Sequence, residues 1–142
     1  MRKWTCMMMA VLLLICCGGC QNSAEPYALQ QDTAQIERIE VIALVDMYTC
    51  TAERYVVLAE IGEETMPDFI ADFSRLMSYS IINPPFRYLS EIGIKFYYAD
   101  GSHEIVCEMG AYDSAHDAFD GWCYFDTTEF FSFLQKYGVV VE

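Results

Sequence analysis

The amino-acid sequence predicts an α+β fold, in which an antiparallel sheet of about five strands has two helices packed on one face. Five short segments rich in apolar residues indicate strands, and the runs 92–98 and 105–109 among them alternate with period two. Two further segments repeat their apolar residues every three or four positions, like one face of a helix. The strands come as hairpins separated by helices (β-β-α-β-β-β-α), an order that favours an antiparallel sheet over a doubly wound one.

The first two strands are expected between Ile36 and Val45 and over Tyr55–Ile61. The first segment is apolar on both faces near its centre, which indicates a central strand. A polar break, Tyr48–Glu53, separates it from the second, so we expect the two to pair antiparallel.

The first helix is expected from about Met66 to Met77, where apolar residues follow a 3.6-residue period. Pro67 suits the first turn, and Asp68 lies where the helix dipole favours negative charge. Residues 78–89 are expected to be irregular, because they contain Asn83-Pro-Pro85.

A hairpin is the clearest short-range signal in the second half. The runs 92–98 and 105–109 alternate, and Asp100-Gly101 lies between them, where glycine can adopt the positive φ of a tight turn. A fifth strand is expected at 121–125. Asp126-Thr-Thr-Glu129 fits a capping box for a helix that ends near Gly138.

The N-terminus has the layout of a secretory signal. Arg2 and Lys3 are followed by the apolar run Met7–Ile15, and then by Gly18-Gly19-Cys20. The alternative is an uncleaved membrane helix, but the apolar run is shorter than the roughly 18–20 residues that a bilayer span needs.

Residues 1–20 resemble a bacterial lipoprotein signal peptide. The resemblance implies that Cys20 receives a diacylglycerol on its thiol, that cleavage removes residues 1–19, and that the protein is anchored at the extracytoplasmic face of the cell membrane. The family usually has Leu, Val or Ile three residues before the lipidated cysteine, where this chain has Cys17. Cys17 itself, with Leu14 three residues before it, is the alternative acceptor.

The exported part is expected to be a flexible tether, residues 20–35, followed by a single α+β domain, residues 36–142. The tether is polar and shows no strand or helix period. The exported part holds six basic residues and 21 acidic residues, a formal net charge of −15. This charge excludes nucleic acid as an expected partner and favours a cationic partner, metal ions or a hydrated surface.

Three cysteines remain after Cys20, namely Cys50, Cys107 and Cys123. If the strands around residues 107 and 123 pair antiparallel about residue 115, Cys107 and Cys123 face each other, and a disulfide or two buried thiols are the open alternatives. Cys50 is then the odd thiol.

Candidate chemistry is sparse, and neither an enzyme activity nor a cofactor is expected. The acidic loop offers weak metal candidates in Asp113, His116, Asp117 and Asp120, but it lacks the ligand spacing of an EF-hand loop, so a solvated turn is the preferred interpretation. Ser102 and His103 are expected to diverge, because neighbouring residues on a strand point to opposite faces.

Aromatic residues suggest an exposed binding surface, because Tyr and Trp combine large contact areas with a polar tip. Alternation assigns most of them to the core and leaves four candidates, which are Phe86, Tyr112, Trp122 and Tyr124.

We therefore expect an exported, lipid-anchored binding or envelope-accessory module without catalytic activity. The alternative is an acidic inhibitor or immunity-like protein that blocks a basic exported partner, and a small hydrolase comes third. A deep pocket with converging polar groups would favour the hydrolase.

Overall fold

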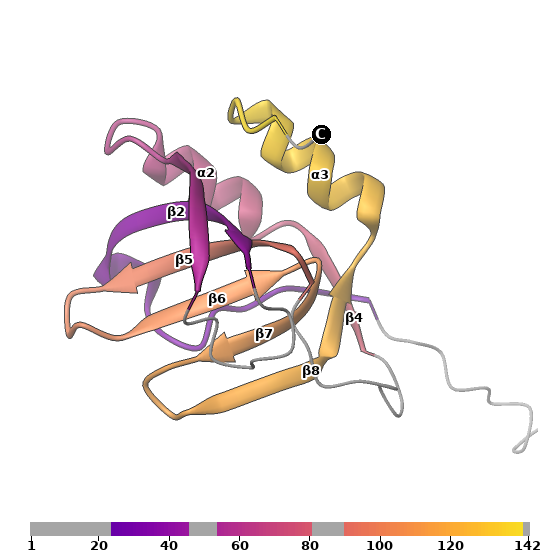
Figure 1. Ribbon diagram of the computed structural model, residues 1–142, viewed down its shortest axis with the longest axis horizontal. Coiled ribbons are helices and arrows are strands. Elements are labelled where there is room, and N and C mark those ends of the chain that lie inside the picture. The colour runs from indigo at the N-terminus through magenta and orange to yellow at the C-terminus, as the bar shows by residue number, and fades with distance from the viewer. Residues whose placement is uncertain (1–23, 46–53, 81–89, 141–142) are drawn as a thin grey trace, which may run out of the picture.

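The computed structural model describes residues 24–45, 54–80 and 90–140 (Figure 1). It confirms an α+β fold with an antiparallel sheet and two α-helices. The described part of the sheet has eight strands in the order β1-β4-β8-β7-β6-β5-β2-β3, more than the five expected. The elements are β1 (Glu25–Pro26), the 3₁₀ turn η1 (Thr33–Gln35), β2 (Ile36–Leu44), β3 (Tyr55–Glu60), α2 (Met66–Phe73), β4 (Met77–Ser80), β5 (Ile92–Tyr98), β6 (His103–Cys107), β7 (Met109–Asp113), β8 (Ala118–Phe125) and α3 (Thr127–Lys136).

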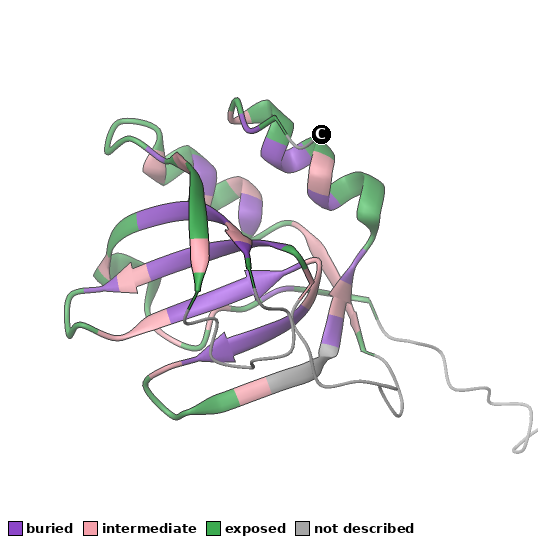
Figure 2. Cartoon of the chain, viewed as in Figure 1, coloured by how far each residue is buried: buried purple, intermediate pink, exposed green. Residues whose placement is uncertain are grey.

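Both helices pack their aromatic faces into one hydrophobic core on the sheet (Figures 1 and 2). The ring centroids of Phe69 on α2 and Phe133 on α3 lie 4.8 Å apart. Phe73 on α2 lies 5.0 Å from Phe96 on β5, so α2 contacts both the second helix and the sheet. The opposite face carries a smaller buried cluster of Ile42, Leu44, Ile105, Cys107 and Tyr112.

The local signals for the hairpin and the last helix are confirmed. Gly101 has a φ of +86°, and the amide of Ser102 donates to Asp100 Oδ1 at 2.9 Å. Asp126 caps α3 by accepting from the Glu129 amide at 3.0 Å, and Gly138, with a φ of +80°, follows the helix. These features depend only on neighbouring residues, which is why the sequence predicts them.

The N-terminal segment corrects the expected domain boundary at residue 36. Glu25–Pro26 pairs with β4, and Tyr27 lies in the core with 9% of its surface exposed. The tether expected over residues 20–35 therefore belongs to the folded domain from Glu25 onward. Its partner strand β4, Met77–Ser80, begins at the expected end of the first helix and continues into chain that we expected to be irregular, and it also pairs with β8.

The expected register of Cys107 and Cys123 is wrong. The alternating run 105–109 contains two strands, β6 and β7, joined through Glu108, so β7 lies between β6 and β8. Cys107 pairs with Gly93, and Cys123 pairs with Ser80. Both cysteines are buried and are not joined in a disulfide, and Cys50 lies outside the described residues. The apolar alternation continues from Ile105 through Cys107 to Met109, across the turn at Glu108–Met109, so it does not reveal that the chain reverses there.

Within residues 24–45, 54–80 and 90–140, neither helix has the length and apolar character that crossing a bilayer requires.

Candidate functional site

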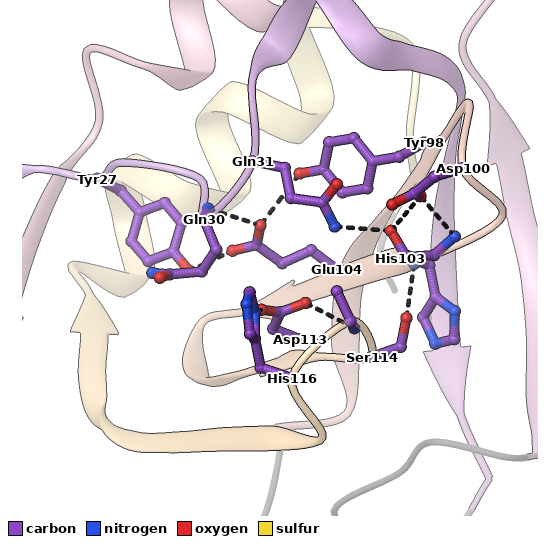
Figure 3. A network of polar contacts seen from close by, with 12 residues as sticks. Tyr27, Gln30, Gln31, Tyr98, Asp100, His103, Glu104, Asp113, Ser114 and His116 are labelled. Carbon is purple, nitrogen blue, oxygen red and sulfur yellow. Dashed lines mark hydrogen bonds and ion pairs between the residues drawn. The ribbon is translucent and has the colours of Figure 1, made fainter.

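A pocket of about 240 Å³ lies where the N-terminal segment meets β6, β7 and the start of β8. Its polar lining includes Glu104, Asp113 and His116, and its aromatic lining is Tyr27, Tyr112 and Phe119. Figure 3 shows that the carboxylates of Glu104 and Asp113 project from adjacent strands beneath the N-terminal segment.

Glu104 is the central acid of this pocket and is only 1% exposed. Its Oε1 accepts from the Tyr27 hydroxyl at 2.9 Å, and its Oε2 accepts from the Gln30 amide at 2.9 Å and from the Tyr98 hydroxyl at 3.1 Å. Burial raises the pKa of Glu104 above its usual range, although these three hydrogen bonds act in the opposite direction. Glu104 thereby attaches the N-terminal segment to the sheet.

Asp113 lies directly opposite Glu104 in the register of β6 and β7 and is 5% exposed. Its Oδ1 accepts from the Ala115 amide at 2.9 Å, and its Oδ2 lies 2.5 Å from Nδ1 of His116. The side chain of His116 is 70% exposed. The pocket therefore contains two buried acids, Glu104 and Asp113, and the exposed imidazole of His116 contacts Asp113.

Two turns frame the pocket beside these acids (Figure 3). Gln31 Nε2 donates to Ser102 Oγ at 2.6 Å, and Ser102 Oγ donates to Asp100 Oδ1 at 2.5 Å. The His103 amide donates to Ser114 Oγ at 2.7 Å. The Gln31 contact connects the N-terminal segment to the β5–β6 turn. The His103 contact connects the β5–β6 turn to the β7–β8 turn.

Ser102 and His103 have separate surroundings. Ser102 contacts Asp100 and Gln31, whereas the ring centroid of His103 lies 6.3 Å from that of Tyr97 and 6.1 Å from that of Tyr112. Burial, followed by the positive charge of Lys95, lowers the pKa of His103.

The weak metal candidates are only partly brought together. Asp113 and His116 are in contact, but Asp117 accepts from the Tyr112 hydroxyl at 3.0 Å instead. The side chain of Asp120 is outside the described part. Among the side chains that the structure describes, no group of three or more His, Cys, Asp or Glu residues could hold a metal ion.

The four aromatic surface candidates have different environments. Tyr112 is 9% exposed and lines the pocket, so it is not an exposed surface residue. Tyr124 is partly exposed and stacks on Tyr79 at a centroid separation of 5.3 Å. Phe86 lies outside the described residues, as does the side chain of Trp122.

A second polar network crosses β2, β3 and β5. The Tyr97 hydroxyl donates to Glu40 Oε2 at 2.6 Å and lies 3.0 Å from the Tyr55 hydroxyl, to which Lys95 Nζ donates at 3.2 Å. The hydrogen bond between Tyr55 and Tyr97, and then the neighbouring Lys95, lower the pKa of Tyr55. Arg38 completes the network through Glu40 at 3.1 Å. Each charged group in this network has a hydrogen-bond or ion-pair partner, so the network links β2, β3 and β5.

Sequence reasoning missed Glu104 and Tyr27, the two residues that define the pocket. Glu104 shares a strand face with Val106, and a carboxylate on an apolar strand face is a signal that could have identified it. Tyr27 gives no such signal, because only the tertiary fold brings it to Glu104, 77 residues away.

No family model, curated protein or solved structure matches this chain.

Proposed function

We propose that this protein is an exported, lipid-anchored binding module whose pocket holds a cationic nitrogen of its ligand. The observation that carries the proposal is the position of two buried carboxylates, Glu104 and Asp113, directly opposite each other in one pocket. The expected membrane location rests on the signal and on Cys20.

The Glu104–Asp113 pair is energetically costly when both carboxyl groups are charged. Like charges directly opposite each other on neighbouring strands destabilise a sheet, and burial adds to that cost. His116, whose side chain is 70% exposed, contacts Asp113 Oδ2 and no atom of Glu104. A ligand cation between Glu104 and Asp113 would offset the repulsion between the two carboxylates. Glu104 Oε1 retains a lone pair after accepting from Tyr27, since a carboxylate has about four acceptor sites.

The aromatic lining favours the same ligand. Tyr27, Tyr112 and Phe119 line the pocket, and the face of an aromatic ring attracts a cation by about 0.5–2 kcal/mol. An ammonium or guanidinium group is therefore the ligand chemistry that fits the lining best.

Binding accounts for these contacts better than hydrolysis does. A general acid must exchange its proton with substrate, whereas Glu104 already accepts hydrogen bonds from Tyr27, Gln30 and Tyr98. The pocket does contain converging polar groups, so hydrolysis remains the third hypothesis.

The acidic inhibitor is the second candidate, favoured by the formal net charge of −13 for the whole chain. In that case the cationic nitrogen would be a Lys or Arg side chain of a basic exported protein. Long-range attraction to such a partner would weaken strongly with added salt.

Calorimetric titration of the protein with butylammonium, guanidinium and neutral butanol tests the proposal. We expect the cations to bind and the alcohol not to bind. Glu104→Gln and Asp113→Asn should each weaken cation binding about tenfold, the order expected for removing a hydrogen-bonded charge partner. Asp68→Asn, which removes an exposed acid on α2, is the matched control.

Equal binding of cation and alcohol would contradict the pocket assignment, as would unchanged affinity in both variants with the fold intact. Binding of a basic protein but of neither small cation would favour the inhibitor.

A further inference from the structure

Strand β3 forms one edge of the sheet and carries an unusual amount of exposed apolar surface (Figure 2). Among the described residues, five large apolar side chains are exposed. Three of them, Val56, Val57 and Leu58, lie on β3, with exposures of 55%, 45% and 42%. A fourth, Val45, is 55% exposed and lies just after β2, beside the start of β3, where its amide donates to the Arg54 carbonyl at 2.9 Å.

This edge lacks the side chains that usually prevent pairing. Edge strands present unpaired backbone groups, and proteins commonly protect them with Lys, Pro or inward-pointing charges. The segment Tyr55–Ala59 contains no charged residue and no proline. A bulge beside β2 occurs at Leu58, but it exposes a large apolar side chain rather than a charge.

We propose that β3 is a self-association edge, at which a second copy of this chain pairs antiparallel with the first. Isologous pairing about a two-fold axis needs one self-complementary surface, and an apolar strand edge meets this requirement. The bulge at Leu58 limits the regular stretch to Tyr55–Val57, so Val56 lies on the two-fold axis and Tyr55 of each copy lies opposite Val57 of the other.

The charges at the two ends of β3 favour a second copy as the occupant. Exposed Arg54 precedes the strand, and exposed Glu60, Glu63 and Glu64 lie at its other end. Antiparallel pairing brings opposite strand ends together, so Arg54 of each copy lies opposite Leu58 of its partner, two positions from the partner's exposed Glu60. A parallel arrangement would instead place like charges side by side.

The inference is independent of the ligand pocket, because β3 contributes no residue to the pocket lining. Failure of cation binding would therefore leave it unaffected.

Cysteine cross-linking of the full-length protein in membranes tests the pairing. We expect Val56→Cys to form a disulfide-linked dimer on mild oxidation, beyond the background that the parent chain gives through its native cysteines. Val140→Cys is the matched control, because Val140 is the remaining exposed large apolar residue, at 77%, and lies outside the edge.

Charge reversal tests the antiparallel orientation. We expect Arg54→Glu and Glu60→Arg each to weaken self-association of the detergent-solubilised full chain about tenfold in sedimentation experiments, because each dimer contains two such contacts. The double variant should recover most of the loss, since it restores opposite charges.

Equal cross-linking of the Val56→Cys and Val140→Cys variants would overturn the proposal. Cross-linking of Val56→Cys to a different protein, or labelling of this edge by a lipid-phase probe without dimer formation, would assign the edge to another occupant. Charge reversals without effect would overturn the antiparallel orientation.

Discussion

Gly93 on β5 and Cys107 on β6 lie directly opposite each other, and a β-carbon added at Gly93 would come within 2.6 Å of Cys107 Sγ. Cys107 is fully buried, so its sulfur is surrounded by protein atoms. The absence of a side chain at Gly93 therefore provides the room for this thiol.

Gly93→Ala should destabilise the domain by about 1–3 kcal/mol, the usual cost of overpacking a core. Chemical denaturation of the single variants and of the Gly93→Ala/Cys107→Ala double variant measures this effect. In the Cys107→Ala background, Gly93→Ala should cost much less, because the nearest atom is gone. Additive costs would mean that the thiol is not the obstacle.

Gly101→Val should destabilise the domain by about 1–3 kcal/mol through backbone strain alone. Gly101 has a φ of +86° and open space where a side chain would lie. Gly62 offers the matched control, because its side-chain position is also open while no such φ applies there. Equal denaturation midpoints for Gly101→Val and Gly62→Val would contradict this assignment of the turn.

Glu104 should make the folded state less stable as pH rises. Burial raises the pKa of Glu104 above the 4.5 usual for a solvent-exposed glutamate, so the folded state retains this proton after the unfolded state has lost it. Stability therefore falls as pH rises from that value through the pKa of the folded state.

Glu104→Gln removes this contribution. As pH rises from 4 to 8, the free energy of unfolding of the wild type should therefore fall relative to that of the variant, as measured by denaturant unfolding. A difference that does not vary with pH would show that Glu104 does not titrate in this range.

Cys107 and Cys123 should resist alkylation in the native protein. Burial raises the pKa of the Cys107 thiol, and the thiolate is the reactive form. Peptide mapping after labelling with iodoacetamide at pH 8, with and without denaturant, checks this expectation. Rapid labelling of Cys107 under native conditions would contradict it, and a Cys107–Cys123 bridge would contradict the pairing of these strands.

Cys20→Ala should leave an unprocessed precursor without lipid. A diacylglycerol supplies two acyl chains, and two chains hold a protein at a membrane where one is marginal. Metabolic labelling with fatty acid and the size of the product provide the readout. Normal labelling and maturation of the variant would move the acceptor to another residue, with Cys17 as the alternative.

The elements that the sequence predicted well are those specified by near neighbours. Asp100-Gly101 marks the hairpin, and Asp126 and Gly138 mark the two ends of α3, because each acts within a few residues of itself. The alternation of β5 likewise identifies its core face, since side chains on a strand alternate regardless of what pairs with it.

The candidate site was predicted much less well. Asp113 and His116 were identified, but as weak metal ligands, and the acid opposite them was missed. Glu104 lies in an apolar strand pattern, and its contacts with Tyr27 and Gln30 span 77 and 74 residues.

Period, turn chemistry and capping in the sequence by themselves determined the fold class, the β5–β6 hairpin and the last helix. Only the tertiary structure decided that the N-terminal segment closes the pocket, that β6 and β7 are separate strands, and which residue each buried cysteine faces. The sequence reveals turns and helix ends because these signals act through the backbone of adjacent residues. Strand order and the burial of Glu104 instead depend on which distant segments pack together.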